Sequence, residues 1–326
     1  MGKGKQDLIQ HIKKEFEALQ EFFSSIETLE DAIFDREVER RLGSINESAK
    51  LVPEHREELM RWCYELSGRE LDSSIVMKHA RGKPLGYPGD FRLIDMLYKN
   101  KPCSQGKGLL WDKMFLRQPA AHAVRNRKKF FEEMLYSSCQ ENDKTSVLSL
   151  ACGSCHEVLD AMRTLNTAVF NCSFHFVDQD RRAIEHSKSL FNGDFPDSIE
   201  LKWEVANVFH IRPKQKYSLI WVSGLFDYLD NRLGAALLGR MWHWLDNGGR
   251  IIVGNFHPRN PNRNQMEWCL GWFLIHRTES ELAGICNRAG IPADSVFFEL
   301  EPLGINIFLV INKKEGAYES KKIFGF

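Results

Sequence analysis

The chain has 326 residues, and its 44 basic and 44 acidic side chains cancel. A neutral chain has no general attraction for nucleic acid or for an anionic membrane, so we expect neither as a partner. No apolar run approaches the roughly 20 residues that span a bilayer, which argues against stable membrane insertion. The N-terminus also lacks the apolar core of an export signal, so we expect a soluble, cytoplasmic protein with reduced cysteines.

The first part of the chain has mainly helical patterns. Apolar residues recur at spacings of three and four from Ile9 to Ile26, which predicts an amphipathic helix. We interpret its apolar stripe as packing within its own domain. The alternative is a dimerisation helix in a homodimer, although the stripe covers fewer than three heptads. Further helices are predicted over 54–66 and 120–136, so residues 1–142 are expected to form a helical N-terminal domain.

Short β-rich runs begin near residue 146 and alternate with segments long enough for crossover helices. The expected strands are 146–150, 173–177, 201–205, 217–222, 250–254, 295–300 and 305–311. Unbroken apolar runs occur at Leu219 to Val222 and at Ile251 to Val253, as expected for strands buried on both faces. We predict an α/β domain over 143–312 with a doubly wound, Rossmann-like, mainly parallel seven-stranded sheet that ends in a hairpin, followed by a tail over 313–326.

The segment from Val147 to Glu157 runs from an apolar strand through small residues into a helix. Cys152 to His156 fits the C-x-x-C-H spacing of covalent haem attachment, but that chemistry needs export from the cytoplasm. A zinc site would need a second closely spaced cysteine pair, which the chain lacks, so no metal is expected. A structural turn without a ligand is a further alternative. We favour a turn that presents backbone N–H groups to a cofactor.

An acidic residue ends the second expected strand. Asp178 lies about 25 residues past Gly153, which suits a carboxylate that accepts hydrogen bonds from ribose hydroxyls. Asp180 is better suited to capping the next helix. The turn has one glycine where a dinucleotide site needs more, so a cofactor with ribose and adenine but no phosphate fits better. These features favour S-adenosylmethionine, with Asn207 either near its adenine or in a turn.

The chain resembles class I S-adenosylmethionine-dependent methyltransferases over about 143–312. The segments that carry the resemblance are Val147 to Glu157, Phe176 to Asp180, Asn207, Tyr217 to Gly224 and Leu245 to Arg250. The sequence departs from that pattern at 151–155, where many members keep three alternating glycines, and at Asn207, where aspartate is common. The resemblance implies cofactor contacts from Ala151, Cys152, Gly153, Asp178, Gln179, Asn207, Val208, Ser223, Gly224 and Arg127.

A narrower resemblance extends from about 80 to 312, to bacterial proteins named for making the extracellular factor 3-hydroxypalmitic acid methyl ester. It is carried by Gly86 to Phe91, Gly224 to Leu229, Gly254 to Phe256 and Met266 through Thr278. It implies methylation of a carboxylic acid such as a hydroxylated fatty acid. The alternatives are another oxygen or nitrogen acceptor, a protein or RNA acceptor, or a cofactor-binding regulator or scaffold without turnover.

A carboxylate acceptor is ionised near neutral pH and needs no general base, but it needs a cation to hold it. Arg125, Arg127 and Arg277 are the candidates, with solvated helix surface as the alternative for each. Arg127 is also a candidate for the methionyl carboxylate of the cofactor. Trp268 is expected on one helix with Trp272 and Phe273, where these rings either line an apolar acceptor pocket or pack in the core.

Five residues are candidates for direct roles at the acceptor. Tyr87 and Asp90 flank a tight turn that can bring a phenol and a carboxylate together, although Asp90 is equally suited to capping the helix that follows. Asp227 and Tyr228 come just after the fourth strand and either face the acceptor or anchor the next helix. His257, just after the fifth strand, is the first choice for a proton acceptor if one is needed, with His276 second.

Overall fold

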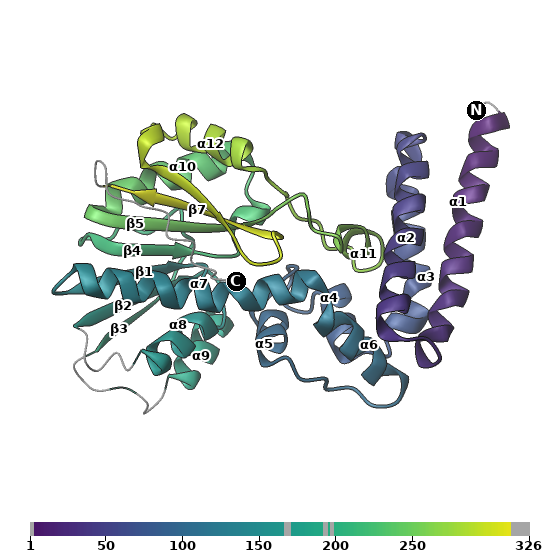
Figure 1. The fold of residues 1–326 in the computed structure, drawn as a ribbon, viewed down its shortest axis with the longest axis horizontal. Coiled ribbons are helices and arrows are strands. Elements are labelled where there is room, and N and C mark those ends of the chain that lie inside the picture. Colours follow the sequence, from purple (N-terminus) through teal and green to yellow (C-terminus); the bar gives the residue numbers. More distant parts are fainter. Residues whose placement is uncertain (1–2, 166–170, 192–194, 196–198, 314–326) are drawn as a thin grey trace. The chain divides into compact units, whose positions relative to one another are not determined.

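The computed structural model describes residues 3–165, 171–191, 195 and 199–313. The chain forms two compact units (Figure 1). Unit 1 comprises Met1–His122 and Asn260–Phe273, and unit 2 comprises Ala123–Arg259 and Leu274–Phe326. Among the described helices, none is both long enough and apolar enough to cross a membrane.

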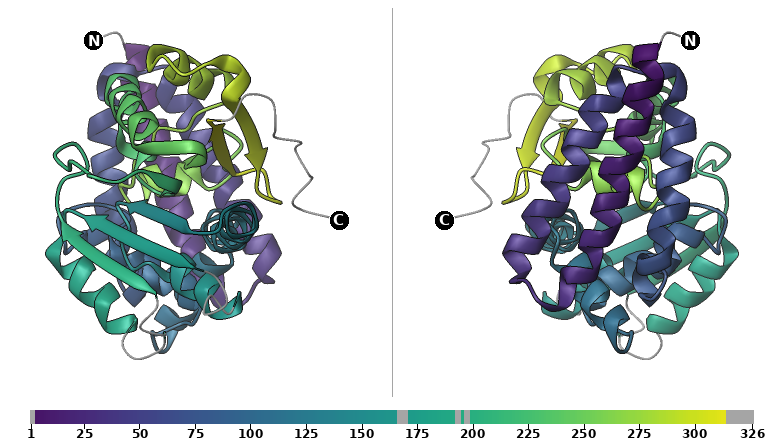
Figure 2. Two further views of the ribbon diagram at one scale, coloured as in Figure 1. Left: turned by 90° about the vertical axis from the view of Figure 1, so that its left-hand side faces the viewer. Right: turned by 90° about the vertical axis from the view of Figure 1, so that its right-hand side faces the viewer.

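Unit 1 is helical. Its elements are α1 (Lys3–Phe22), η1 (Phe23–Glu27), α2 (Asp31–Lys50), η2 (Pro53–His55), α3 (Arg56–Leu71), α4 (Ile75–Gly82), α5 (Phe91–Lys99), α6 (Lys107–Arg117), the start of α7 (Pro119–Glu141) and α11 (Arg263–Trp268). The expected amphipathic helix is confirmed as α1 and η1, which lie alongside α2 and α3 (Figure 2). Ile12, Phe16 and Leu19 of its apolar stripe are fully buried, as expected for a helix packed within its own domain.

Unit 2 contains the expected seven-stranded sheet. Its strands are β1 (Thr145–Leu150), β2 (Cys172–Asp178), β3 (Glu200–Val205), β4 (Tyr217–Val222), β5 (Leu245–Phe256), β6 (Val296–Leu300) and β7 (Asn306–Asn312). Their order is β3-β2-β1-β4-β5-β7-β6, with β1 to β5 parallel and β7 antiparallel to both β5 and β6. The predicted terminal hairpin is therefore confirmed. β5 begins earlier than predicted because Leu245 already pairs with Tyr217, before an irregularity in the register.

Helices cover both faces of the sheet (Figure 1). α10 (Asn231–Trp244) and α12 (Glu279–Arg288) pack on one face, and α7, α8 (His156–Thr164) and α9 (Arg181–Leu190) pack on the other. Short 3-10 turns, η4 (Phe226–Tyr228) and η5 (Ala293–Ser295), complete unit 2. This layering explains why β1, β2 and β4 are rich in apolar residues and almost completely buried: each is covered on both sides.

The observed units do not coincide with the boundary predicted at 142–143. α7 continues from unit 1 into unit 2, where Phe130 stacks on Phe308 of β7 with ring centroids 3.9 Å apart. That part of α7 belongs with the sheet because it buries aromatic rings against it. Residues 260–273 belong to unit 1 although they follow the fifth strand. The predicted tail over 313–326 lies outside the described residues except for Lys313.

The prediction that Trp268, Trp272 and Phe273 lie on one helix is wrong. α11 ends at Trp268, and Gly271 has a left-handed φ of 57°, after which the chain is non-helical. A φ in that range is incompatible with a continuing right-handed helix. Trp272 is buried, whereas Phe273 is 53% exposed, so the three rings do not form one helical face.

Candidate active site

The turn between β1 and α8 has an unusual backbone. Ala151, Gly153 and Cys155 all have left-handed φ values, of 49°, 54° and 54°. This conformation costs an L-residue roughly 1–2 kcal/mol, whereas glycine adopts it freely. These are the alternating positions at which the resemblance noted in the sequence leads us to expect glycine. The turn therefore retains the backbone that glycines would favour, although two of the three positions carry side chains.

Asp178 joins this turn to the end of β2. Its carboxylate accepts hydrogen bonds from the backbone N–H of Gly153 and of Asp180, each at 2.9 Å. Burial raises the pKa of Asp178, and the backbone hydrogen bonds partly offset that effect. A carboxylate has about four acceptor positions, so capacity remains for other donors. Asp180 caps α9 by accepting from the backbone N–H of Arg182 at 2.9 Å, as predicted.

The cysteine side chains of this turn are buried. Cys152 and Cys155 are both buried, and burial is the main reason that the pKa of the Cys152 thiol is raised. Within the described part of the chain, no cluster of histidine, cysteine or acidic residues is suited to hold a metal ion. The hydroxyl of Ser154 is also buried, and it has no hydrogen-bond partner among the described residues.

Asn207 occupies a turn after β3. Its side-chain carbonyl accepts from the backbone N–H of Phe209 at 2.9 Å, and its amide lies 3.4 Å from the Gln179 side-chain oxygen. Asn207 therefore acts as a turn residue, the second of the two roles expected for it. It is also exposed, at the carboxyl edge of the sheet. The neighbouring Val208 side chain is buried in the core between the sheet and α10.

Arg127 lies at the carboxyl end of β4. It is 4% exposed and donates through Nη1 to the Ser223 carbonyl and through Nε to the Val124 carbonyl at 3.3 Å. A guanidinium has five N–H donors, and Nη2 of Arg127 contacts no acceptor among the described residues. A β-carbon at Gly224 would lie 3.4 Å from Nη1, so a side chain there would crowd the guanidinium.

Glu157 lies in the candidate site but was not among the residues selected from the sequence. It is 5% exposed in the first turn of α8, and its Oε1 accepts from the Trp221 indole and the Ser223 hydroxyl, each at 3.2 Å. Its position at the end of the recognised strand–turn–helix segment was the available signal. Glu157 links α8 to the end of β4 on the same side as Arg127.

A second buried network joins the ends of β4 and β5. The Asp227 carboxylate accepts from the backbone N–H of Phe256 at 2.7 Å, and burial raises the pKa of Asp227 to about 6 although two arginines oppose that effect. Arg277 donates through Nη1 to the Phe226 carbonyl at 2.7 Å and to the Asn255 side chain at 2.9 Å. Arg277 is 2% exposed, so it is neither solvated surface nor open to a ligand without rearrangement.

His257 follows β5 as predicted, and both of its ring nitrogens have neighbours. Nδ1 accepts from the backbone N–H of Arg259 at 3.2 Å. Nε2 lies 3.5 Å from a Glu279 carboxylate oxygen. His257 therefore connects the end of β5 to the first turn of α12, and a role as proton acceptor stays a prediction.

Two other candidates in unit 2 are more accessible. Tyr228 is 38% exposed in η4, beside the buried Asp227. Arg125 is half-buried on α7, and burial lowers the pKa of its guanidinium. Their roles as acceptor contacts stay predictions.

The remaining candidates belong to unit 1. Asp90 is the N-cap of α5, accepting from the Arg92 and Leu93 N–H groups at 3.0 Å, and both of its oxygens lie 2.8 Å from His79 Nε2. The capping alternative for Asp90 is thus observed, and Tyr87 is half-buried in the loop before it. The Trp268 ring is buried against the Arg56 guanidinium within unit 1.

The family comparison agrees with the fold. The profile of a family described as "Putative methyltransferase" matches residues 36–306. No curated protein sequence matches the chain at the level taken as significant.

Among solved structures, a possible exported protein from Bordetella parapertussis has a TM-score of 0.59 at 18% identity, over 78% of this chain and 93% of that one. Magnesium protoporphyrin IX methyltransferase from Synechocystis, with bound S-adenosylmethionine, has a TM-score of 0.47 at 9% identity, over 74% and 97%. The N-methyltransferase NodS from Bradyrhizobium japonicum, with S-adenosylhomocysteine, has 0.42 at 12%, over 61% and 90%. By the family profile, which matches residues 36–306, the chain belongs to the family described as "Putative methyltransferase".

Proposed function

We propose that the chain binds S-adenosylmethionine at the carboxyl ends of β1, β2 and β4 and transfers the methyl group to a small-molecule acceptor, preferably a carboxylate. The observation that carries the proposal is the left-handed turn at 151–155, linked to Asp178 through the N–H of Gly153. In parallel α/β sheets, ligands bind beyond the carboxyl ends of the strands, where this turn and this carboxylate lie.

The side chains at this edge suit the cofactor. Asp178 retains acceptor capacity for ribose hydroxyls, and Arg127 retains N–H donors for the methionyl carboxylate. The buried hydroxyl of Ser154, which has no partner among the described residues, lies within the same turn. When bound, the cofactor supplies a methyl group on a positively charged sulfur. The work left to the protein is to align the acceptor and exclude water.

The engaged side chains favour an acceptor that needs no base. A hydroxyl or ammonium acceptor must lose a proton, whereas a carboxylate is already ionised near neutral pH. His257 accepts a backbone hydrogen bond at Nδ1 and faces Glu279 at Nε2. Asp227 is held by the backbone of Phe256. Because His257 is engaged in these contacts and Asp227 is buried and bound to the backbone, methyl transfer to a carboxylate requires the least rearrangement.

A hydroxylated fatty acid is our preferred acceptor within that class. The support is the resemblance carried by residues 224–229, 254–256 and 276–278. These three segments contact one another through Asp227, Phe256 and Arg277. Because they are far apart in sequence and make one buried network, they act as one structural feature beside the proposed cofactor site.

Calorimetric titration with S-adenosylmethionine and S-adenosylhomocysteine tests the cofactor site. Replacing Asp178 by alanine should weaken binding tenfold or more, because a charged acceptor for two hydroxyl donors is lost. Asp180→Asn is the matched control, since asparagine retains the cap of α9 and leaves Asp178 in place. Unchanged affinity in Asp178→Ala, or no binding by the unmodified chain, would contradict the proposal. A labelled methyl donor then allows a screen of hydroxy fatty acids and other carboxylates.

A second candidate function is a cofactor-binding regulator without turnover. It is favoured by one observation: Asp227 and Arg277, on the expected acceptor side, are both buried and committed to backbone groups. The two candidates differ in one measurable outcome. Transfer of labelled methyl to any extract component excludes the regulator without turnover.

A further inference from the structure

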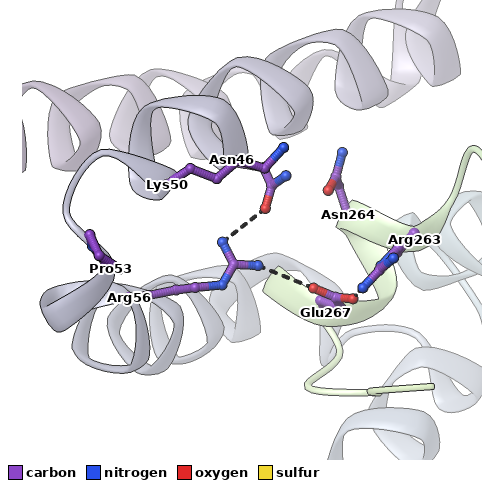
Figure 3. Close-up of a pocket in the computed structure, with 7 residues that line it drawn as sticks. All are labelled: Asn46, Lys50, Pro53, Arg56, Arg263, Asn264 and Glu267. Carbon is purple, nitrogen blue, oxygen red and sulfur yellow. Dashed lines mark hydrogen bonds and ion pairs between the residues drawn. The ribbon is translucent and has the colours of Figure 1, made fainter. Parts of the chain in front are cut away.

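A cavity of about 430 Å³ lies within unit 1, and none of its lining residues is among those assigned above to the proposed cofactor site. Its lining residues come from the end of α2, from η2, from the start of α3 and from α11, and they are Asn46, Lys50, Pro53, Arg56, Arg263, Asn264 and Glu267 (Figure 3). We propose that this cavity binds a small molecule through an oxyanion group, either a phosphate or a carboxylate.

The charges around the cavity favour an anion. Arg56 donates through Nη2 to Oε2 of Glu267 at 3.2 Å, and Arg263 donates through Nε to Oε1 of the same carboxylate at 2.6 Å. Two guanidinium groups thus share one carboxylate, which leaves one positive charge uncompensated. Lys50 is paired with Glu47 at 2.6 Å, but its ammonium has two further donors. No acidic side chain other than Glu267 lines the cavity.

Arg56 is held in place before any ligand arrives. Its guanidinium lies 5.2 Å from the centre of the Trp268 ring, in a cation–π contact, and Nη1 donates to Oδ1 of Asn46 at 3.0 Å. Oδ1 of Asn46 also accepts from the Trp268 indole at 3.2 Å. A preorganised guanidinium loses little conformational freedom when it binds an oxyanion.

Two side-chain amides with unused hydrogen-bonding groups border the same cavity. Because Oδ1 of Asn46 accepts two hydrogen bonds, its orientation is set, and its Nδ2 group makes no hydrogen bond to another described residue. The Asn264 amide, opposite Asn46 in Figure 3, has no hydrogen-bond partner among the described residues either. A ligand group that only accepts hydrogen bonds matches this set of donors, and phosphate and carboxylate are such groups.

The volume of the cavity and the exposure of its cationic side chains indicate which kind of ligand it binds and how tightly. A volume of about 430 Å³ is within the range of small-molecule sites, so the cavity has room for a body attached to the oxyanion. The Lys50 and Arg263 side chains are 58% and 48% exposed, so their contribution is screened by salt. We therefore expect modest affinity that falls as ionic strength rises.

Calorimetry on the full chain at constant ionic strength tests the site, with inorganic phosphate and citrate as the two probes. The stronger probe identifies which oxyanion the cavity prefers. Asn264→Ala removes a donor with no partner to lose, and we expect affinity to fall several-fold without a change in the thermal unfolding midpoint. Arg56→Met should weaken binding tenfold or more, since a hydrogen-bonded charge is removed.

Arg40→Met is the matched control. Arg40 is on α2, ten residues and about 15 Å before Lys50, and it pairs with Glu37 at the surface. Binding unchanged in Arg40→Met and in Asp178→Ala, but weakened in both cavity variants, supports the site and separates it from the cofactor site. The proposal is overturned if neither probe binds at millimolar concentration, or if Asn264→Ala binds as tightly as the unmodified chain.

Discussion

Replacing Asp227 by asparagine should stabilise unit 2 at alkaline pH and have a smaller effect in acid. The carboxylate is 4% exposed and has a pKa of about 6, against an ordinary value of 3.8, chiefly because of burial. Asparagine keeps an oxygen that can accept from the backbone N–H of Phe256, the contact that Asp227 makes at 2.7 Å. The substitution therefore removes the buried charge and retains the hydrogen bond.

The direction of this pH dependence follows from the raised pKa of Asp227. The folded state binds the proton more tightly than the unfolded state, so this group's contribution is complete below the unfolded pKa of 3.8 and is lost as the pH rises to about 6. Each pH unit over this window is worth about 1.4 kcal/mol, which gives a total cost of about 3 kcal/mol at pH 8. By the same relation the cost near pH 4.5 is about 1 kcal/mol, because the unfolded chain has begun to ionise.

Thermal unfolding of both proteins at pH 4.5 and pH 8 measures this difference. For a domain of this size we expect Asp227→Asn to raise the midpoint by about 6–12 °C at pH 8 and about 2–4 °C at pH 4.5. Asp246→Asn is the control, because Asp246 is exposed on β5 and should shift neither midpoint. An equal change at both pH values, or a lower midpoint at pH 8, would refute the reasoning from burial.

Three further outcomes are expected. Glu39→Gln should raise the thermal unfolding midpoint more at pH 8.5 than at pH 5. Burial raises the pKa of Glu39 from 4.5 to about 7, so ionisation of this carboxyl lowers the stability of the fold between those two pH values. A change in the midpoint that is independent of pH would count against this prediction. Ala151→Gly should lower the free energy of unfolding by less than about 1 kcal/mol, or raise it, because relief of the backbone strain at φ 49° offsets the conformational entropy that glycine loses on folding. Ala161→Gly, inside α8, is the comparison and should lower the free energy of unfolding by about 1 kcal/mol. Equal losses in the two variants would show that the turn is unstrained. The sulfur atoms of Cys139 and Cys172 lie 3.4 Å apart, so hydrogen peroxide should oxidise the two thiols to a disulfide with release of water. Peptide mapping without reductant should then recover the two peptides linked. Absence of the linked peptides would show that the two side chains do not meet.

The hydrophobic pattern was enough to predict the sheet. All seven strands and the terminal hairpin were predictable because strands buried on both faces contain runs of consecutive apolar residues, such as Leu219 to Val222 of β4. Local capping was readable for a similar reason, since Asp180 and Asp90 cap helices through backbone groups only two or three residues away. The turn at 151–155 was placed correctly, but its backbone conformation was not evident from one glycine.

The arrangement of buried polar groups depends on contacts distant in sequence. Arg277 reaches the carbonyl of Phe226 and the side chain of Asn255, and Arg56 shares Glu267 with Arg263. No local pattern distinguishes such arginines from solvated ones, because burial is set by which elements pack together. The same reason explains why α7 divides between the units and why the helix predicted beyond Trp268 ends there. Periodicity along the chain is a local property and specifies strands and helices, whereas charge pairing and cavities arise when segments far apart in sequence are packed against one another.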